Sequence, residues 1–194
     1  DLGETARACM PTILQAFLGR PDDTPAGDAF ERRLYVCRRT IEKKADAEFA
    51  LRDKIFYVCS MSSRTIVYKG MLVATQMRRF FIDLNDAAVK TAVALVHSRY
   101  STNTTPSWER AHPNRFIIHN GEINTLKGNV NWIRAREPNL YSPVLQHDLE
   151  RVMPIINREG SDSAILDNVL EFLVMNGRPL TRAASMLLPE PWDH

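Results

Sequence analysis

The predicted fold rests first on one apolar run near the middle of the chain, Thr91-Ala92-Val93-Ala94-Leu95-Val96-His97. Its few charges and its β-branched residues are typical of a strand buried on both faces. A second run of the same kind is Phe116-Ile117-Ile118-His119. Each run ends in a cluster of polar side chains, and loops at the ends of such elements often carry function. We therefore expect two buried strands with chemistry at their ends.

Helical and strand-like periods alternate along the rest of the chain, which predicts a mixed α and β domain. Residues 54–59 and 64–70 are rich in β-branched and aromatic residues and flank a short turn, so they predict a hairpin. Residues 12–18 are a further strand candidate. Apolar residues at helical spacing predict a surface helix from 30 to 48, and the charged run 38–44 is interpreted as its solvated face.

Composition places the chain among ordinary globular proteins. Of its 194 residues 44% are hydrophobic and 25% are charged, and the formal net charge is +2. This length suits one domain with a hydrophobic core, and the profile is not that of a disordered protein. So small a net charge argues against a nucleic acid or an anionic membrane as partner, including binding through the Arg-rich residues 32–44. No stretch is long and apolar enough to span a bilayer.

The sequence contains three cysteines, Cys9, Cys37 and Cys59, and five histidines. The cysteines do not have the spacing of a disulfide framework, which favours a reducing compartment. We expect all three to be structural rather than nucleophilic. The cysteines and histidines also lack the spacing of zinc ligands, so no metal is expected.

The polar cluster after the first apolar run is His97-Ser98-Arg99-Tyr100-Ser101-Thr102-Asn103-Thr104. A guanidinium at the end of a buried strand can form a bidentate pair with a carboxylate, and neighbouring hydroxyls can add donors. Arg99 is therefore a candidate for binding a substrate carboxylate. The alternative is an arginine that fixes loops through backbone carbonyls, and the residues alone leave both open.

The second cluster is His119-Asn120-Gly121-Glu122-Ile123-Asn124. An asparagine amide beside an unobstructed glycine N–H can hold an oxyanion. Asn-Gly is also the commonest tight turn, which is the alternative here. A helix predicted from Asn124 to Arg136 would place the glycine near a helix N-terminus, where anions are stabilised.

The third cluster is Glu159-Gly160-Ser161-Asp162-Ser163, ahead of a predicted helix at 164–174. These residues either cap that helix, or Asp162 accepts hydrogen bonds from an ammonium group. Together the clusters offer a cation for a carboxylate, an oxyanion site and a carboxylate for an ammonium. This pattern is the outline of an amino-acid substrate whose side-chain carbonyl is attacked.

Longer motifs carry a resemblance to a known family. They are Ser62 through Leu72, His97 through Trp108, Ala111-His112-Pro113, His119 through Thr125, and Gly160-Ser161-Asp162-Ser163-Ala164. Over nearly its whole length the chain resembles the glutaminase domains of glutamate synthases, which are class II glutamine amidotransferases. The resemblance implies that residues 1–194 are a single partial domain of α+β class. The implied fold is the αββα sandwich of N-terminal-nucleophile hydrolases, with two mainly antiparallel sheets between helices, incomplete at the N-terminus.

The resemblance also implies roles for individual residues. Arg99, helped by Thr102, would hold the α-carboxylate of glutamine, and Asp162 would hold its α-ammonium. Asn120 and Gly121 would form the oxyanion hole. In the family a first-residue cysteine attacks the amide, and its segment is expected upstream of the stretch that begins here at Asp1. The chain alone is therefore expected to be inactive.

The implied function is release of the amide nitrogen of L-glutamine as ammonia, which is channelled to the reductive amination of 2-oxoglutarate to L-glutamate. The implied partners are the central and FMN-binding synthase domains. FMN and an iron–sulfur cluster are implied for the full enzyme, and no cofactor for this chain. NADPH, NADH and ferredoxin stay open as electron donor. The expected compartment is the cytoplasm, or a plastid in a plant or alga. The alternative is a non-catalytic remnant, or a regulatory or interaction module of the same fold.

Overall fold

The computed structural model describes residues 2–49, 55–98, 100, 105–121, 123–124, 126–157 and 159–188. The α-helices are α1 (Glu4–Ala8), α2 (Asp28–Phe49), α3 (Met77–Phe80), α4 (Leu126–Arg136), α5 (Leu149–Val152), α6 (Asp162–Met175) and α7 (Leu180–Leu187). Short 3₁₀ helices are η2 (Ala74–Gln76), η3 (Ile82–Asn85), η4 (Glu137–Asn139) and η5 (Gln146–Asp148). Within the described ranges, the connecting segments are extended or turn-like and form no strand.

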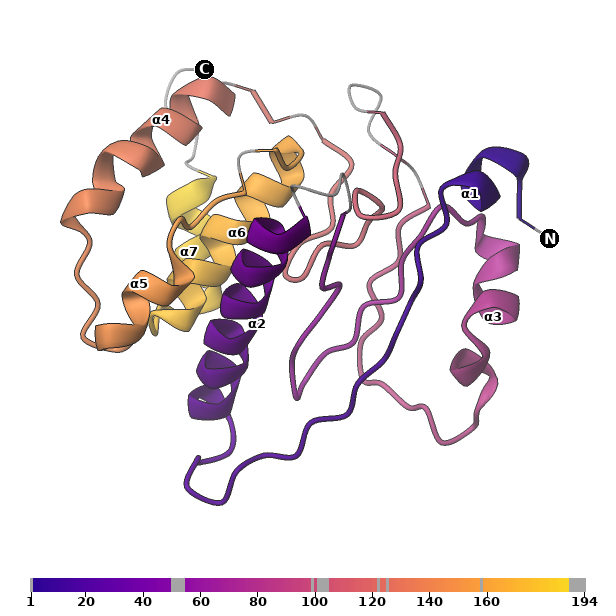
Figure 1. Ribbon diagram of the computed structural model, residues 1–194, viewed down its shortest axis with the longest axis horizontal. Coiled ribbons are helices and arrows are strands. Elements are labelled where there is room, and N and C mark those ends of the chain that lie inside the picture. The colour runs from indigo at the N-terminus through magenta and orange to yellow at the C-terminus, as the bar shows by residue number, and fades with distance from the viewer. Residues whose placement is uncertain are drawn as a thin grey trace.

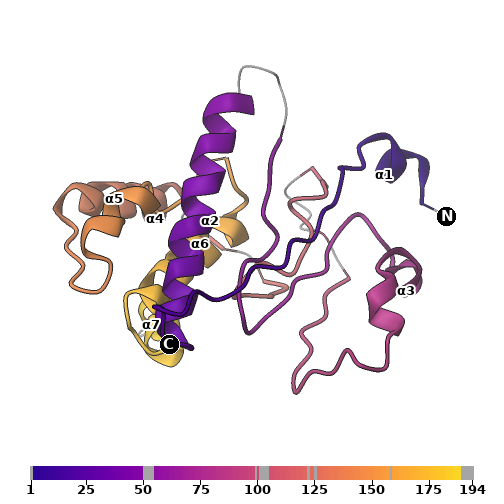
Figure 2. The same ribbon diagram turned by 60° about the horizontal axis from the view of Figure 1, so that its bottom comes forward.

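The helices form two groups (Figure 1). The larger group contains α2, α4, α5, α6 and α7, whereas α1 and α3 lie on the opposite side of the molecule. Extended segments cross the region between the two groups, as the turned view also shows (Figure 2). Within the larger group α2 packs against α5 and α6, and α6 packs against α7. The hydrophobic core therefore lies in the larger helical group.

The core is built from the apolar faces of these packed helices. Tyr35 of α2, Val152 of α5, and Val169 and Phe172 of α6 are all buried in it. Ile156, in the segment between α5 and α6, is 1% exposed. Burial of each such side chain contributes roughly 1.5–3 kcal/mol, so this helical cluster is the main source of stability.

Helix α2 confirms the helix predicted over 30–48. Gly27 precedes it with φ +83°, a left-handed conformation that glycine adopts without strain. Glu31 lies in the first turn, where a carboxylate interacts favourably with the positive end of the helix. That carboxylate also accepts hydrogen bonds from Ser62 Oγ at 2.7 Å and from Ser63 N at 2.8 Å. The turn at 60–63 is thereby tied to the start of α2.

The prediction that the charged run of α2 is solvated is wrong for Arg38, which is only 1% exposed. Its guanidinium donates to both carboxylate oxygens of Glu42 at 2.8 Å and to Glu171 of α6 at 2.5 Å. Glu42 also accepts from Arg39 at 3.0 Å and from Arg115 at 2.9 Å. Burial alone would lower the pKa of Arg38, but the two carboxylates outweigh it and raise that pKa. This buried ion cluster links α2 to α6.

The predicted αββα sandwich is wrong for the described part of the chain. The first apolar run, 91–97, is extended but has no neighbouring strand, and Val93 and Val96 are 73% and 80% exposed. Residues 12–18 are likewise extended and exposed, with Leu14 at 87%. An apolar run becomes a buried strand only where adjacent backbone supplies hydrogen bonds and another layer covers it. Neither is present in the described residues around these runs.

The hairpin predicted from 54–59 and 64–70 does not form among its described residues. Both arms are extended, but the backbone N–H of Val67 donates to the side-chain hydroxyl of Ser60 at 3.2 Å instead of to a carbonyl in a ladder. Serine hydroxyls compete for backbone groups in this way at turns. The turn is therefore fixed by side chains, including the contacts of Ser62 and Ser63 with α2.

The second apolar run, 116–119, is half-buried and begins in a bend, and a helix residue accepts the hydrogen bonds of its first two N–H groups. Asp167 of α6 accepts from Phe116 N at 2.7 Å and from Ile117 N at 2.9 Å through one oxygen, and from Arg115 N at 3.1 Å through the other. Burial raises the pKa of Asp167, which is 1% exposed, and the backbone donors oppose that rise. A carboxylate on α6 thus takes the place that a neighbouring strand would have had.

Candidate functional site

The structure describes some of the predicted site residues and not others. Asn120, Gly121 and Asp162 lie in the described part of the chain, whereas Arg99 and Thr102 lie outside it. The roles given to Arg99 and Thr102 remain predictions. The site can therefore be built from the second and third polar clusters.

These two clusters meet at the N-terminus of α6. The three backbone bonds to Asp167 hold residues 115–117 against this helix, so the next residues pass its first turn. There His119 Nε2 lies 2.7 Å from the hydroxyl oxygen of Ser163. Ser163 is 3% exposed, so the contact is buried on the helix side. Segments that are distant in sequence are thereby joined within the candidate site.

Asp162 is the first residue of α6, and its neighbour Ser161 is the N-cap. Ser161 Oγ accepts a hydrogen bond from Ala164 N at 3.2 Å, which confirms the predicted capping role for this cluster. Asp162 Oδ1 accepts from the backbone N–H and the hydroxyl of Ser163, at 2.7 and 3.2 Å. Among the described residues Asp162 Oδ2 accepts no hydrogen bond. A half-buried carboxylate with one free oxygen is suited to an ammonium group.

Asn120 and Gly121 are exposed and directly follow His119, which contacts Ser163. The hairpin turns typical of Asn-Gly need a positive φ at the glycine, but the described residues with positive φ are Gly27, Gln146 and Gly177. The tight-turn alternative therefore does not account for this dipeptide. Gly121 N–H donates to His119 Nδ1 at 3.2 Å, and within the described chain the Asn120 side chain has no hydrogen-bond partner. The Asn120 amide is therefore open to a ligand at the surface, whereas the Gly121 N–H is engaged by His119 Nδ1.

Three histidine rings lie near one another in tilted arrangements, and one of them is that of His119. The ring centroids of His97 and His112 are 4.6 Å apart, and those of His112 and His119 are 5.6 Å apart. Burial lowers the pKa of His112 to about 4, and the neighbouring rings of His97 and His119 add to this effect. His112 is therefore neutral at physiological pH, and its buried Nδ1 has no partner within the described chain.

The free energy of unfolding should rise with pH between about 4 and 6.5 because of His112. The unfolded chain takes up this proton near pH 6.5 and the folded chain only near pH 4, so in this window the unfolded state binds more protons. The difference corresponds to at most about 3.5 kcal/mol at roughly 1.4 kcal/mol per pH unit, and less because the ring is partly exposed. Urea denaturation across the window should show a flatter dependence in His112→Phe. His147→Phe, the matched change at an exposed histidine, should leave the pH dependence of the free energy of unfolding as in wild type. An equal pH dependence in wild type and His112→Phe would contradict the lowered pKa of His112.

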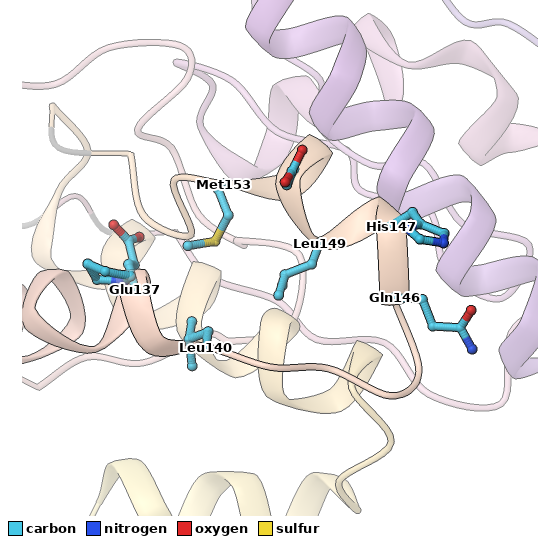
Figure 3. A pocket seen from close by; sticks show the side chains of 8 residues that line it. Glu137, Leu140, Gln146, His147, Leu149 and Met153 are labelled. Atoms are coloured by element: carbon cyan, nitrogen blue, oxygen red, sulfur yellow. The ribbon is translucent and has the colours of Figure 1, made fainter.

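A cavity of about 370 Å³ lies elsewhere, between η4 at the end of α4 and the η5–α5 segment (Figure 3). Its lining includes Leu140, Leu149 and Met153, and polar side chains such as Glu137 and His147. Glu137 already accepts a hydrogen bond from Ile155 N at 2.8 Å, which is a structural role. The cavity contains none of the predicted site residues, and no convergent set of donors for an amino acid is present among its lining side chains.

The described residues give no support for a metal or redox centre in this chain. Among them, no group of three His, Cys, Asp or Glu side chains could hold a metal ion. The site residues therefore do not fit an iron–sulfur cluster. A search of the described helices found none long and apolar enough to cross a membrane.

The cysteines differ in their surroundings. Burial raises the pKa of the Cys59 thiol, and Lys69 and Arg115 only partly oppose this. A nucleophilic cysteine needs the opposite shift, because the thiolate is the reactive form. Cys9 donates to Thr5 O at 3.1 Å within α1 and its cap. The environment of Cys59 is thus that of a structural thiol.

Sequence reasoning missed His119 and Ser163 as parts of the site. Both adjoin predicted residues, but they are 44 positions apart and no local spacing pairs them. Asp167 was also missed, although an aspartate within an apolar helical stretch is an unusual buried group. A buried aspartate of this kind indicates that buried hydrogen-bond donors lie next to it.

Comparison with known proteins identifies the family of this chain. The family model described as "Glutamine amidotransferases class-II" matches residues 1–194, so the chain belongs to the class II glutamine amidotransferases. Among curated proteins it is 51% identical to the NADPH glutamate synthase large chain of Bacillus subtilis (strain 168) over 191 residues, which are 98% of this chain and 12% of that protein. It is 46% identical to the NADH glutamate synthase of Schizosaccharomyces pombe, over 100% of this chain and 9% of that protein. It is 42% identical to the chloroplastic ferredoxin-dependent glutamate synthase of Spinacia oleracea, over 100% of this chain and 12% of that protein. The chain thus spans about a tenth of the length of these relatives.

Proposed function

We propose that this chain is the glutamine-binding part of a glutamate synthase and acts in the release of the glutamine amide nitrogen as ammonia. One observation carries the proposal. Asn120 and Gly121, with donors for an oxyanion, are joined through His119 and Ser163 to Asp162, with a carboxylate for an ammonium. A free amino acid with a side-chain carbonyl has both matching groups. Its carbonyl becomes the oxyanion, and its α-ammonium pairs with the carboxylate.

The two ends of glutamine are assigned by charge. The α-ammonium binds the free oxygen of Asp162, where it forms a charge-assisted hydrogen bond. The α-carboxylate binds Arg99 and Thr102, on the evidence of the sequence motif. Recognition by a few placed charges is consistent with the small net charge of +2.

The amide end of glutamine lies at Asn120 and Gly121. When a nucleophile attacks the amide carbon, the carbonyl electron pair moves to oxygen, and the side-chain amide of Asn120 donates to that oxyanion. The N–H of Gly121 gives up its bond to His119 Nδ1 and becomes the second donor. Collapse of the intermediate reforms the carbonyl and expels ammonia once the leaving nitrogen has been protonated. The attacking group is the N-terminal cysteine of the family, and Cys59, whose thiol pKa is raised by burial, is not suited to that role.

The proposal extends to the whole protein through its relatives. All 194 residues belong to one domain, which the family match over residues 1–194 supports. The ammonia is used in other domains, which aminate and reduce 2-oxoglutarate with FMN and an iron–sulfur cluster. The printed names of the relatives include NADPH-, NADH- and ferredoxin-dependent enzymes, so the electron donor is not assigned. We place the protein in the cytoplasm, or in a plastid if its source is a plant or alga.

Asp162→Asn in the full-length protein that carries these residues tests the function. Asparagine keeps an oxygen for the two bonds from Ser163 but removes the negative charge. A hydrogen bond to a charged group contributes about 1.5–3 kcal/mol, so KM for glutamine should rise by roughly 10–100-fold while kcat falls much less. Ammonia release is measured at varied glutamine concentration.

Asp148→Asn is the matched control. Asp148 carries a surface ion pair with Arg151 at 3.0 Å, and its loss should leave KM unchanged. An unaltered KM in Asp162→Asn would refute the assigned ammonium site. A wild-type full-length protein that releases no ammonia from glutamine would instead support a non-catalytic module.

A further inference from the structure

Both parts of the candidate site are attached to the same helix. Asp162, which offers the carboxylate for the ammonium, is the first residue of α6. The segment that leads to Asn120 is bound through its backbone to Asp167. Asp167 lies further along α6 from Asp162, at an axial distance of about 7.5 Å. Helix α6 is therefore the common reference from which the two parts of the site are spaced.

The attachment at Asp167 is close and lies in a rigid part of the molecule. One carboxylate oxygen accepts from Phe116 N at 2.7 Å and from Ile117 N at 2.9 Å, and the other accepts from Arg115 N at 3.1 Å. Asp167 is almost fully buried, and Val169 on the same helix belongs to the hydrophobic core. Hydrogen bonds to a charged acceptor are stronger than bonds between neutral groups. Asp167 thus holds three consecutive backbone groups against α6.

Arg115 has a second attachment, but that attachment leaves the register of the segment open. Its guanidinium donates to Glu42 of α2 at 2.9 Å. A long arginine side chain has several rotamers and can keep such an ion pair while its own backbone shifts. The three backbone N–H groups on Asp167 have no such freedom. Asp167 therefore determines the register of residues 115–117 on α6.

This register decides where Asn120 lies. Asn120 follows Ile117 by three residue steps, which span at most about 11 Å. A slip of one residue at 115–117 would displace Asn120 along the chain by about 3.3 Å. Glutamine and asparagine differ in reach by one methylene, or at most about 1.5 Å. The distance from Asp162 to the Asn120 amide thus depends on Asp167 at the scale that separates these two amino acids.

We propose that Asp167 is a positioning residue that determines specificity for side-chain length, by holding Asn120 at the distance from Asp162 that glutamine spans. The inference rests on the proposed function. An amino acid that is shorter by one methylene does not reach Asn120 while its ammonium is bound to Asp162. Asn120 is the donor in this argument because its amide is open, whereas the Gly121 N–H is engaged by His119.

Inhibition by two dicarboxylic amino acids measures this specificity. L-Glutamate has the carbon chain of glutamine, and L-aspartate is shorter by one methylene. Both are tested as competitive inhibitors of ammonia release from glutamine by the full-length protein, and selectivity is the inhibition constant of aspartate divided by that of glutamate. An inhibition constant does not depend on how much of the protein is folded, so a loss of stability alone leaves the selectivity unchanged. In the wild type it should be roughly 10–100, because aspartate forgoes one charge-assisted hydrogen bond.

Two substitutions alter the attachment in different ways. In Asp167→Asn an amide nitrogen replaces one carboxylate oxygen, so at least one backbone N–H of the segment loses its acceptor. In Asp167→Glu both acceptor oxygens remain, but the added methylene moves them by up to about 1.5 Å. Each substitution should lower the selectivity by at least about fivefold, mainly through weaker binding of glutamate.

Glu171→Gln is the matched control. Glu171 is also a buried carboxylate of α6, but it pairs with Arg38 of α2 and not with the segment that leads to the site. Its replacement should leave the selectivity within about twofold of wild type, whatever it does to stability. A loss of selectivity as large as that of the Asp167 variants would contradict the inference.

The outcomes distinguish this inference from the function on which it rests. If Asp162→Asn raises KM as expected but both Asp167 variants keep the wild-type selectivity, Asp167 is merely structural and the inference is refuted. Full selectivity in Asp167→Glu also refutes it, because the acceptors would then be sufficient whatever their position. Equal inhibition of the wild type by the two amino acids overturns it even if neither variant folds. If Asp162→Asn leaves KM unchanged, the proposed function itself fails.

Discussion

Replacement of Asn120 by alanine in the full-length protein should lower kcat for ammonia release from glutamine by on the order of 10²–10³. The substitution removes one of the two donors assigned to the oxyanion, and that charge develops only in the transition state. KM should therefore change much less than kcat. Asn120 is exposed, so its truncation leaves no cavity and should not destabilise the fold.

Asn139→Ala provides the control for this result. Asn139 is likewise exposed, but it ends η4 beside the cavity that contains no predicted site residue. Its replacement should leave both kinetic constants unchanged. The oxyanion assignment would be untenable if Asn120→Ala retained wild-type kcat, or if it raised KM alone.

Replacement of Arg38 by methionine should destabilise the 194-residue chain by about 3–5 kcal/mol. Methionine fills much of the same volume but leaves Glu42 and Glu171 buried without their shared cation. Arg39 and Arg115 still contact Glu42, so the uncompensated charge falls mainly on Glu171. Urea denaturation followed by helical circular dichroism measures the change.

The same substitution at Arg33 of α2 isolates the effect of burial. Arg33 pairs with Asp23 at 3.1 Å, but both side chains are more than half exposed. Loss of that pair should cost at most about 1 kcal/mol. Adding Glu171→Gln to Arg38→Met should recover part of the loss, because it removes the stranded charge. Equal stability of Arg33→Met and Arg38→Met would show that the buried cluster does not hold α2 to α6.

Local sequence signals predicted α2, α4 and α6, but not α3, α5 or α7. Apolar spacing located α2, the stretch after Asn124 contains α4, and the polar cluster at Ser161 caps α6 as expected. Such signals are sufficient because a helix satisfies its backbone within one segment. The burial of Arg38 could not be predicted, because it depends on Glu171, which is 133 positions away.

The predicted strands did not form, and the reason is again a dependence on residues that are distant in sequence. Apolar and β-branched runs favour strands, but residues 91–97 and 116–119 are in neither a helix nor a strand, with bends at Ala92 and Phe116. Whether extended segments pair depends on distant partners, which no local pattern specifies. At 116–117 the partner is Asp167 of a helix, and its carboxylate accepts the hydrogen bonds that a sheet would have taken.

Site residues could be predicted from the sequence where they lie within a recognisable motif. Asn120, Gly121 and Asp162 stood out by residue type, and the structure brings their segments together. The His119–Ser163 contact that joins them was not predictable from spacing. For Arg99 and Thr102 the role in carboxylate binding stays a prediction, since they lie outside the described residues.

The central claim is that glutamine binds with its ammonium on Asp162 while its amide lies at Asn120 and Gly121. Its most direct test is a cycle between substrate and protein, in which kcat/KM for ammonia release is measured with glutamine and with its α-deamino analogue, glutaramate. Both substrates are given to the wild-type full-length protein and to Asp162→Asn. Such cycles isolate the interaction between the two altered groups.

The account predicts that removal of the ammonium lowers kcat/KM by roughly 10–100-fold in the wild type and by less than about threefold in Asp162→Asn. An equal loss in both proteins would mean that Asp162 does not contact the ammonium and would contradict the account.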